Sequence, residues 1–267
     1  MDMEGEGGNM AIRLRDVSIG YNGKALFDPI TLSVPKATVT VIIGANGSGK
    51  STLLHTISGN IRPISGIIEI CNSDIATIGN RQLAKIVSLV YTDKLVTGGL
   101  TVGELVSMGR YPYTGFLGRL SSEDKKIVDE SMAAVGIIGK KDCYLANISD
   151  GERQKAMIAR ALAQQTPILL LDEPTNFLDV ASRLEILDLI ARLVKEKQIT
   201  VLLSTHDITA AMEMTDNVIT VIPDNRMPVS IDAKNSKNSM QRMEKVFADR
   251  GIVFDHKDYV FRLNSSK

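Results

Sequence analysis

Gly44-Ala45-Asn46-Gly47-Ser48-Gly49-Lys50-Ser51 has the spacing of a phosphate-binding loop, and its flanks are those that such a loop requires. Residues 38–43 before it form an apolar run typical of a buried strand, and residues 51–57 after it are helix-like. Glycines allow backbone N–H groups to close around a polyphosphate, and the start of a helix adds partial positive charge. We therefore expect a nucleoside triphosphate to bind here.

The polar side chains of this loop are suited to phosphates and to their counter-ion. Lys50 can reach the β- and γ-phosphates, and the hydroxyl of Ser51 can bind Mg²⁺. The residues expected to contact the nucleotide are Gly44, Asn46, Gly47, Ser48, Gly49, Lys50, Ser51 and Thr52.

Composition excludes several other kinds of protein. The 267 residues are enough for one large domain or for a domain with an insertion, and their formal net charge is zero. With no basic excess and no Trp, the chain lacks the usual features of a nucleic-acid-binding protein. Cys71 and Cys143 are too few and too isolated for a disulfide framework or a zinc site. No apolar run approaches the ~18 residues that span a bilayer.

Apolar periodicity indicates an α/β domain with a helical insertion. Short apolar runs typical of buried strands lie at residues 38–43, 168–171 and 199–203, and residues 67–70 indicate another short strand. Residues 151–164 and 183–195 have helical spacing, and strands alternating with helices predict a parallel sheet covered on both faces. From about residue 93 to 150 the pattern changes to helices with glycine breaks, with helices expected at 101–108 and 122–135.

The two ends of the chain are expected to lie outside this domain, which spans residues 12–222. Residues 1–11 are acidic and glycine-rich at their start and lack the pattern of a signal peptide, so we interpret them as a disordered lead-in. Residues 223–267 are interpreted as a C-terminal appendage packed on the domain. Within it, Met243 belongs to a possible short helix, and residues 252–254 and 259–261 can pair as a hairpin.

Two acids, Asp172 and Glu173, follow the buried strand at residues 168–171. Ligand sites in α/β sheets lie at the carboxyl ends of strands. Asp172 can hold Mg²⁺ directly or through water, and Glu173 can orient or deprotonate a water that attacks the γ-phosphate. An acidic helix cap is the alternative interpretation, but the phosphate-binding loop upstream favours catalysis.

A histidine and a helix start complete the set of candidate residues. His206 follows the apolar strand at 199–203 and is expected at the same sheet edge as Asp172, which favours a γ-phosphate contact. His55 and His256 are interpreted as structural. Ser149 and Glu152 form a capping box, which starts many ordinary helices but also leaves backbone N–H groups able to bind an anion.

Taken in order along residues 12–222, these motifs resemble the ATP-binding subunit of an ABC transporter. The order is phosphate-binding loop, helical insert, Ser-x-Gly-[Glu/Gln] signature, strand with Asp-Glu, and strand with His. The resemblance implies an α/β fold: a P-loop NTPase core with a parallel central sheet, an N-terminal antiparallel β part and a helical insertion. It also implies ATP hydrolysis with ATP and Mg²⁺ as the bound species.

The family pattern suggests a role for each matching position. Tyr21 resembles the aromatic residue that stacks on adenine, and residues 176–179 resemble the D-loop. The assignments that the resemblance implies are catalytic Glu173, His206 and Lys50; Mg²⁺ ligands Ser51 and Asp172; signature residues Ser149, Gly151 and Glu152; and the D-loop residue Asp179.

The chain departs from the family pattern at two places. Thr92 occupies the position where the family usually has Gln, a residue that can contact Mg²⁺ and the attacking water. The signature carries Asp150 and Glu152 in place of the commoner Gly and Gln. Because acids repel a γ-phosphate, we expect these two side chains to turn away, leaving the Ser149 hydroxyl and the Gly151 N–H to make the contacts.

Residues 100–106 and the stretch Gly109-Arg110-Tyr111-Pro112-Tyr113 are similar to importers for ferric siderophores, haem and vitamin B12. A turn with surface aromatics is the alternative interpretation of Tyr-Pro-Tyr. The importer resemblance implies a head-to-tail dimer with a second copy, a membrane permease docked on the helical insert near residues 93–113, and indirect action with a substrate-binding protein. It implies no nucleic-acid partner and a peripheral position on the cytoplasmic side of the inner membrane.

Two other functions are left open by the residues. One is a soluble ABC ATPase without a permease, such as an Fe–S assembly type; repair members carry long coiled-coil inserts and translation members usually have two cassettes, and this chain has neither. The other is a nucleotide-binding regulatory subunit with little hydrolysis, which Thr92 favours and which Glu173 and His206 argue against.

Overall fold

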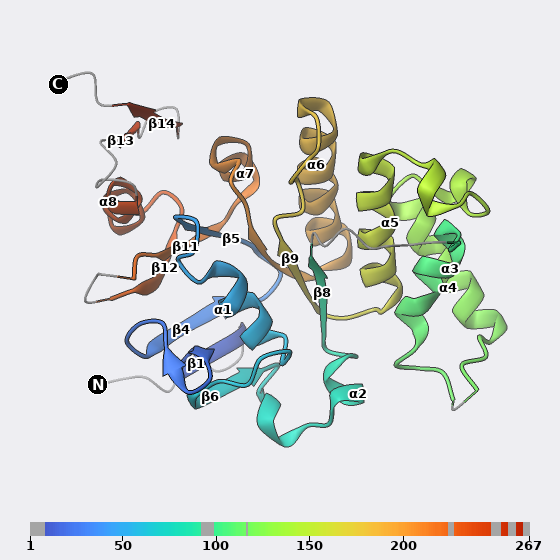
Figure 1. Ribbon diagram of the computed structural model, residues 1–267, viewed down its shortest axis with the longest axis horizontal. Helices are drawn as coiled ribbons and strands as arrows, with labels where there is room; N and C mark the ends of the chain where they lie inside the picture. Colours follow the sequence, from blue (N-terminus) through green and yellow to red (C-terminus); the bar gives the residue numbers. More distant parts are fainter. Residues whose placement is uncertain are drawn as a thin grey trace.

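A six-stranded sheet forms the centre of the molecule (Figure 1). The computed structural model describes residues 9–91, 99–115, 117–223, 227–246, 252–255 and 260–263. The strands, in their spatial order, are β12 (Val229–Ala233), β11 (Asn217–Val221), β5 (Val39–Gly44), β10 (Thr200–Ser204), β9 (Ile168–Asp172) and β8 (Val87–Tyr91). Neighbours are parallel except for β11 and β12, which confirms the parallel sheet predicted from the apolar runs.

Both faces of this sheet are buried, and for that reason its strands are continuous apolar runs. Along β5, the side chains of Val41 and Ile43 lie in one hydrophobic cluster, and the side chain of Ile42 lies in the other. The cluster with Val41 and Ile43 also contains side chains of the helices between residues 102 and 246. The cluster with Ile42 also contains side chains of the helix at residues 50–57 and of the N-terminal strands. The carboxyl ends of β5, β9 and β10 therefore belong to strands that are packed on both faces of the sheet.

The N-terminal part of the chain forms an antiparallel sheet, as the predicted fold class requires. Its strands, in spatial order, are β4 (Ile30–Pro35), β1 (Met10–Ser18), β6 (Ser65–Ile70) and β7 (Ser73–Asp74). Strand β1 begins at Met10, which pairs with Pro35, two residues before the expected start at residue 12. A tight hairpin of β2 (Gly20–Tyr21) and β3 (Lys24–Ala25) turns through Asn22 and Gly23, whose φ angles are 52° and 73°.

The α-helices within the described residues are α1 (Lys50–Ile57), α2 (Asn80–Leu83), α3 (Val102–Ser107), α4 (Ser122–Ala134), α5 (Asp150–Ala163), α6 (Val180–Lys197), α7 (Ile208–Met214) and α8 (Lys237–Val246). Short 3₁₀ turns lie at Ile75–Thr77, Met108–Arg110, Ile138–Lys140 and Leu145–Asn147. Helix α6 begins at Val180 instead of the predicted residue 183, because Asp179 accepts the backbone N–H of Ser182 and caps the helix earlier.

Helices α3, α4 and α5 lie together beyond the β8 side of the sheet (Figure 1). Capping boxes begin α3 at Thr101 with Glu104 and α5 at Ser149 with Glu152, as predicted from the sequence. Helix α4 is capped by Ser121 with Asp124, and Gly136 follows its end with a φ of 76°. Helices α3 and α4 occupy much of the segment expected to be the helical insertion, whereas α5 begins where that segment ends, and this division of the chain stays a proposal.

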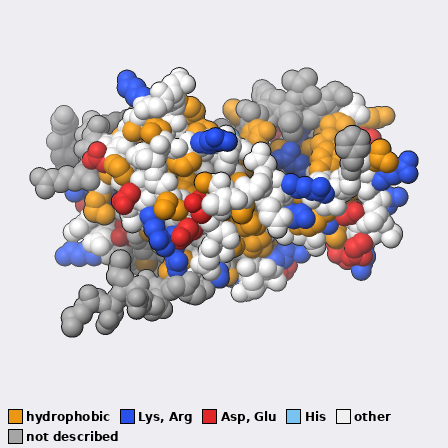
Figure 2. Space-filling model, turned by 90° about the horizontal axis from the view of Figure 1, so that it is seen from below, with side chains coloured by type: hydrophobic (Ala, Val, Ile, Leu, Met, Phe, Trp, Pro, Cys, Tyr) orange, Lys and Arg blue, Asp and Glu red, His pale blue; other side chains and the backbone are white. Residues whose placement is uncertain are grey.

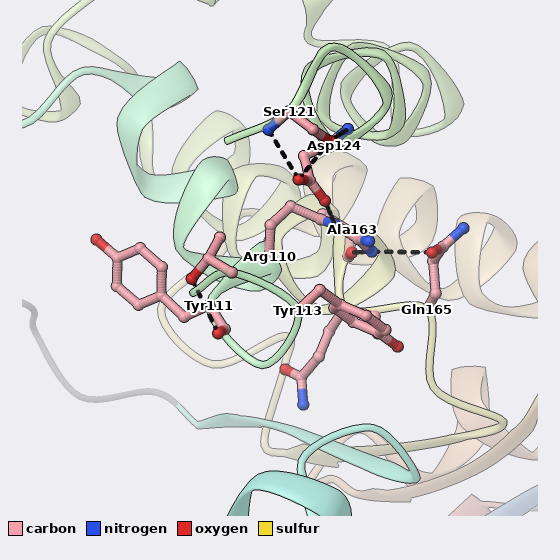
Figure 3. A network of polar contacts seen from close by, with 9 residues as sticks. Arg110, Tyr111, Tyr113, Ser121, Asp124, Ala163 and Gln165 are labelled. Atoms are coloured by element: carbon pink, nitrogen blue, oxygen red, sulfur yellow. Dashed lines mark hydrogen bonds and ion pairs between the residues drawn. The ribbon is translucent and has the colours of Figure 1, made fainter. Parts of the chain in front are cut away.

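A buried network around Arg110 holds this helical group together (Figure 3). The Arg110 guanidinium donates to Asp124 Oδ1 at 2.9 Å, to the carbonyl of Ala163 at 2.7 Å and to Gln165 Oε1 at 2.8 Å. The Cζ atom of Arg110 lies 4.0 Å from the ring centroid of Tyr113. The last turn of α5 is thus tied to the start of α4 by a cation at a helix C-terminus, where a positive charge is favourable.

The C-terminal segment is joined closely to the main core. Strand β12 pairs antiparallel with β11 and so extends the central sheet, which means that the expected division at residue 222 does not coincide with the sheet's edge. Met243 of α8 and Phe254 of β13 (Ile252–Asp255) are buried in the larger core cluster. Strand β13 pairs with β14 (Val260–Leu263), which confirms the predicted hairpin within the described residues.

Charges of both signs are interspersed on the face seen from below (Figure 2). Basic, acidic and apolar side chains alternate over short distances there, and no single sign dominates the described residues of this face. The pattern agrees with the zero net charge of the sequence. It is unlike the basic stripe of a nucleic-acid-binding surface.

Candidate active site

The phosphate-binding loop connects β5 to α1, as predicted, and its glycines are required by space and by backbone conformation. A Cβ atom on Gly44 would lie 2.5 Å from Ser48 Oγ and 2.8 Å from the carbonyl oxygen of Val221. Gly47 and Gly49 have φ angles of 78° and 103°, in the region that favours glycine. No side chain caps the N-terminus of α1 within the described residues. Its first backbone N–H groups therefore remain suited to donate to an anion bound at the loop.

Lys50 is held at the base of this loop. Its Nζ donates to the carbonyl oxygens of Gly44 and Ala45, both at 3.0 Å, and the residue is buried. Burial lowers the pKa of the Lys50 ammonium below its usual range, and the charges of Glu173 and Asp172 oppose that shift. A cation that is removed from water and faces two carboxylates is suited to a polyanionic ligand.

Strand β10 positions the two acids at the end of β9. The Oγ of Ser204 donates to Asp172 Oδ1 at 2.6 Å and accepts the backbone N–H of Glu173 at 3.0 Å. Glu173 has a φ of 52°, so the chain turns sharply there and its side chain leaves the line of the strand. Asn176 Nδ2 then donates to Glu173 Oε2 at 3.1 Å.

His206 lies beside Glu173, at the sheet edge predicted for it. The Nε2 of His206 is 2.5 Å from Glu173 Oε1, and the imidazole is about half exposed while the carboxylate is more buried. Strand β10, which leads to His206, pairs with both β5 and β9, and this order brings the histidine, the acids and the loop to one edge. An imidazole paired with a carboxylate can orient or deprotonate a water molecule.

A cavity of about 700 Å³ gathers most of the predicted nucleotide contacts. Its walls are formed by Tyr21, Leu26, Asn46, Gly47, Gly49, Lys50, Ser51, Thr52, Glu173, Asn176 and His206. Tyr21 is 54% exposed, and its hydroxyl lies 3.4 Å from Thr52 Oγ1. The volume and the exposed ring are suited to a nucleotide whose base lies near the β2–β3 hairpin.

A second cavity of about 590 Å³ continues from the first and holds the predicted magnesium ligands. Ser51, Asp172 and Glu173 line it together with His55, Asn60, Tyr91, Asn176 and Phe177. His55, interpreted from the sequence as structural, faces this cavity, and its ring centroid lies 6.1 Å from that of Tyr91. Its position one helical turn after Ser51 is the sequence signal that could have predicted this.

Ser204 and the role of Asn176 were not predicted from the sequence. Asn176 belongs to the D-loop stretch, but its bond to Glu173 depends on the left-handed turn at Glu173. Ser204 lies in a buried apolar strand, and nothing in its neighbours along the chain indicates a bond to Asp172. Thr92, the predicted Gln-loop position, lies outside the described residues.

The signature residues lie apart from these cavities. Ser149, Gly151 and Glu152 begin α5 and are absent from the walls of both cavities as far as the described residues show. A Cβ on Gly151 would come within 3.0 Å of Ser182 Oγ, so the start of α5 lies against the start of α6. Asp179, from the predicted D-loop, caps α6 at this junction.

The two unusual acids of the signature each bond to groups of this chain, and their expected orientation away from a γ-phosphate stays a prediction. Glu152 Oε2 accepts the backbone N–H of Ser149 at 2.9 Å, and Glu152 Oε1 lies 3.1 Å from Lys140 Nζ. Asp150 pairs with Arg153 at 2.6 Å. Hydrogen bonds from Ser149 and from Lys140 lower the pKa of the Glu152 carboxyl, so this carboxylate is charged at neutral pH.

A loop shaped for a polyphosphate, facing a carboxylate and an imidazole that can act on water, places this chain among the P-loop nucleoside triphosphatases. Residues 27–176 match the ABC transporter family. The chain belongs to the ABC transporter family, and it is an ATP-hydrolysing subunit of that family.

Named relatives match this chain over most of their own length. The iron(3+)-hydroxamate import ATP-binding protein FhuC of Bacillus subtilis is 37% identical over 209 residues, which cover 78% of each chain. The ferric enterobactin transport ATP-binding protein FepC of Escherichia coli is 35% identical over 244 residues, which cover 91% of this chain and 89% of the relative. The dimeric structure of an ATP-binding cassette in a post-hydrolysis state, bound to ADP and Pi, superposes with a TM-score of 0.70 at 25% identity, covering 84% of this chain and 99% of the other.

Proposed function

We propose that this chain hydrolyses ATP in the cavity between the phosphate-binding loop and Glu173, and that hydrolysis energises an importer. The observation that supports it most is the pair of Glu173 and His206, 2.5 Å apart, on the wall of the cavity that also holds Lys50. In this proposal Tyr21 stacks on adenine, the N–H groups of the loop bind the phosphates, and Lys50 neutralises their charge.

We assign Mg²⁺ to Ser51 and Asp172, which both line the second cavity. No group of three His, Cys, Asp or Glu side chains suited to a metal occurs among the described residues. That agrees with Mg²⁺ at phosphates, which takes one or two protein oxygens and completes its shell with phosphate and water. The Oγ of Ser48, buried without a hydrogen-bond partner among the described residues, also fits a loop made to receive a further polar group. When bound, Mg²⁺ neutralises charge that develops on the phosphates.

Glu173 is the proposed group that receives the proton of the attacking water. Asn176 and His206 hold its two oxygens on opposite sides, which limits the rotation of the carboxylate. His206 would then contact the γ-phosphate and report its presence to Glu173. Donors and acceptors fixed before the reaction are the main source of catalysis in phosphoryl transfer.

The site is proposed to be completed by a second copy arranged head to tail. Ser149 and Gly151 of one copy would contact the ATP held by the loop of the other. Two exposed apolar side chains lie near these elements: Phe177, on the wall of the second cavity, is 71% exposed, and Val180, at the start of α6, is 69% exposed. Both are suited to an interface with a second copy.

A membrane permease is the proposed partner of the helical group, with residues 93–113 as the contact segment. Of its described residues, Tyr111 is 57% exposed, beside the buried Arg110 network. None of the described helices is long and apolar enough to cross a membrane. From the importer relatives we propose that the chain is a peripheral subunit at the cytoplasmic face of the membrane. The names of the relatives favour a ferric siderophore as cargo, with haem or cobalamin as the alternatives, delivered by an external binding protein.

The Glu173→Gln variant tests this proposal. Gln keeps the size of the side chain and its bond to Asn176 but cannot take a proton. We expect it to bind ATP as well as the wild type, to lose turnover by on the order of a hundredfold or more, and to accumulate as an ATP-bound dimer by size-exclusion chromatography with light scattering. Rapid turnover in this variant would refute Glu173 as the base, and a monomer at saturating ATP would refute the completed site.

A further inference from the structure

Both acids that distinguish this signature have a cationic partner. Asp150 pairs with Arg153, its neighbour on the same helix, at 2.6 Å. Glu152 pairs at 3.1 Å with Lys140, which comes from a different element. The second pair is the more informative, because the chain must be folded to bring these two residues together.

The backbone of Lys140 is held in place by its own turn. It ends the 3₁₀ turn Ile138–Lys140, and the preceding Ile137 is 3% exposed in the core. The N–H of Lys140 donates to the carbonyl of Ile137 at 2.9 Å, and its carbonyl accepts the N–H of Cys143 at 2.9 Å. The backbone of Lys140 is thus held by hydrogen bonds, and its ammonium group reaches the start of α5.

The carboxylate of Glu152 accepts from three donor groups. Oε2 accepts the backbone N–H of Ser149 at 2.9 Å and its hydroxyl at 3.2 Å, while Oε1 faces Lys140. In return, the N–H of Glu152 donates to Ser149 Oγ at 3.2 Å. The carboxylate and the signature hydroxyl therefore form one unit, and whatever moves or charges Glu152 acts directly on Ser149.

We propose that Lys140 is a positioning residue for the ATP contact made across the dimer: it neutralises Glu152 and holds it in the capping box, where Glu152 fixes Ser149 and the start of α5 that faces the γ-phosphate of the partner's ATP. The inference rests on the proposed head-to-tail dimer. Without Lys140, a full negative charge would stand at the helix start that has to approach a polyphosphate, and like charges repel. With Lys140, the dipole and N–H groups of α5 can act on the phosphate.

The proposed role of the Lys140–Glu152 pair differs from the role of an ordinary surface ion pair. Lys126 and Glu130 on α4 form such a pair at 3.8 Å, with both side chains about two-thirds exposed. Removing a pair of that kind has little effect on stability or on binding. The removal of Lys140 should instead impair one step only, the closing of the ATP-bound dimer, and should leave ATP binding to the single chain unchanged.

The test uses Lys140→Met in the full chain, with Lys126→Met as the matched control. In the Glu173→Gln background, we expect Lys140→Met to raise the ATP concentration at half-maximal dimer formation by about two- to fivefold, the range expected for a partly exposed charge pair. Its Kd for ATP as a monomer should be unchanged. The increase should fall as salt is raised from 0.05 to 0.5 M, since salt screens the exposed charge. Lys126→Met should change neither quantity.

Rescue separates the charge effect from a change in folding. Glu152→Gln removes the charge but keeps a side chain that can complete a capping box, so Lys140→Met combined with Glu152→Gln should dimerise as readily as Glu152→Gln alone. Lys140→Arg should behave like the wild type. Unchanged dimerisation in Lys140→Met, or a defect that Glu152→Gln does not repair, would overturn the role of Lys140. Absence of any ATP-dependent dimer in the parent Glu173→Gln protein would instead overturn the proposed dimer.

Discussion

The hydroxyl of Ser204 donates to the carboxylate of Asp172 at 2.6 Å, across the parallel pair β10 and β9. The same Oγ accepts the N–H of Glu173 at 3.0 Å, so one buried serine orients both acids of the site. These two acids lie at the carboxyl end of β9, at the same side of the sheet as the phosphate-binding loop, with β10 between β9 and β5. The bond explains how a strand end, which is usually the least ordered part of a strand, can hold a carboxylate in a defined direction.

Ser204→Ala should therefore reduce catalysis more than nucleotide binding. We expect kcat for ATP hydrolysis to fall by on the order of tenfold, the lower end of the effect of removing a residue that orients a metal ligand. The Kd for ATP without Mg²⁺ should stay the same. Ser88→Ala is the matched control, because Ser88 is equally buried on β8 and bonds to Thr166 away from the site. Equal kcat losses in the two variants would contradict the role given to Ser204.

Tyr21 supplies a prediction about the adenine base. Its ring is exposed on the cavity wall, and stacking of a base on an aromatic ring contributes about 1–3 kcal/mol when measured by alanine substitution. Tyr21→Ala should thus weaken ATP binding by on the order of tenfold, measured by isothermal titration calorimetry. Tyr21→Phe keeps the ring and loses only a long contact to Thr52, so its affinity should match the wild type. A normal Kd in Tyr21→Ala would place the base elsewhere.

Arg110 is expected to be a stability residue. Replacing it with Met removes the guanidinium donor of Asp124 Oδ1 and of the carbonyl of Ala163, both of which are buried. Breaking a buried pair of this kind costs about 3 kcal/mol, and the loss should appear as a lower midpoint in urea unfolding. Arg15→Met removes an exposed pair with Glu69 and should cost less than about 1 kcal/mol. Similar losses in the two variants would show that the Arg110 network is not held as described.

Asp124 gives the network a defined pH dependence. Hydrogen bonds from Ser121, with a further contribution from Arg110, lower the pKa of this carboxyl in the folded protein. A carboxyl with a lowered folded pKa stabilises the protein fully above its unfolded pKa of about 3.9, and that stability is lost as the pH falls through the folded value. Asp124→Asn should therefore be less stable than the wild type at pH 7, and the difference should shrink below about pH 4. Thermal unfolding at pH 7, 5 and 3 measures this, and a difference that is constant with pH would contradict it.

The helix starts at Thr101 and Ser149 could be predicted from the sequence because a capping box joins residues three positions apart. The start of α6 was predicted too late, since Val180 is exposed and adds nothing to the apolar periodicity, whereas the cap at Asp179 decides where the helix begins. Local chemistry was thus a better guide to helix ends than apolar spacing.

Strand β12 shows the opposite case. Residues 229–233 were expected within a terminal appendage, but their backbone pairs with β11 and extends the central sheet. A short strand of this kind has no local stabilisation to signal its presence, because its hydrogen-bond partners come from another segment. The network of Arg110 with Asp124 and Gln165 depends in the same way on elements that are separate in the sequence.

The sequence by itself determined the phosphate-binding loop, the two acids and the histidine, because each is marked by neighbours a few residues away. Only the tertiary structure decided which residues hold them: Ser204 at Asp172, Asn176 and His206 at Glu173, and Lys140 at Glu152. These partners are set by strand order and by left-handed turns, and strand order follows from burying both faces of the sheet, a requirement that the whole chain meets together.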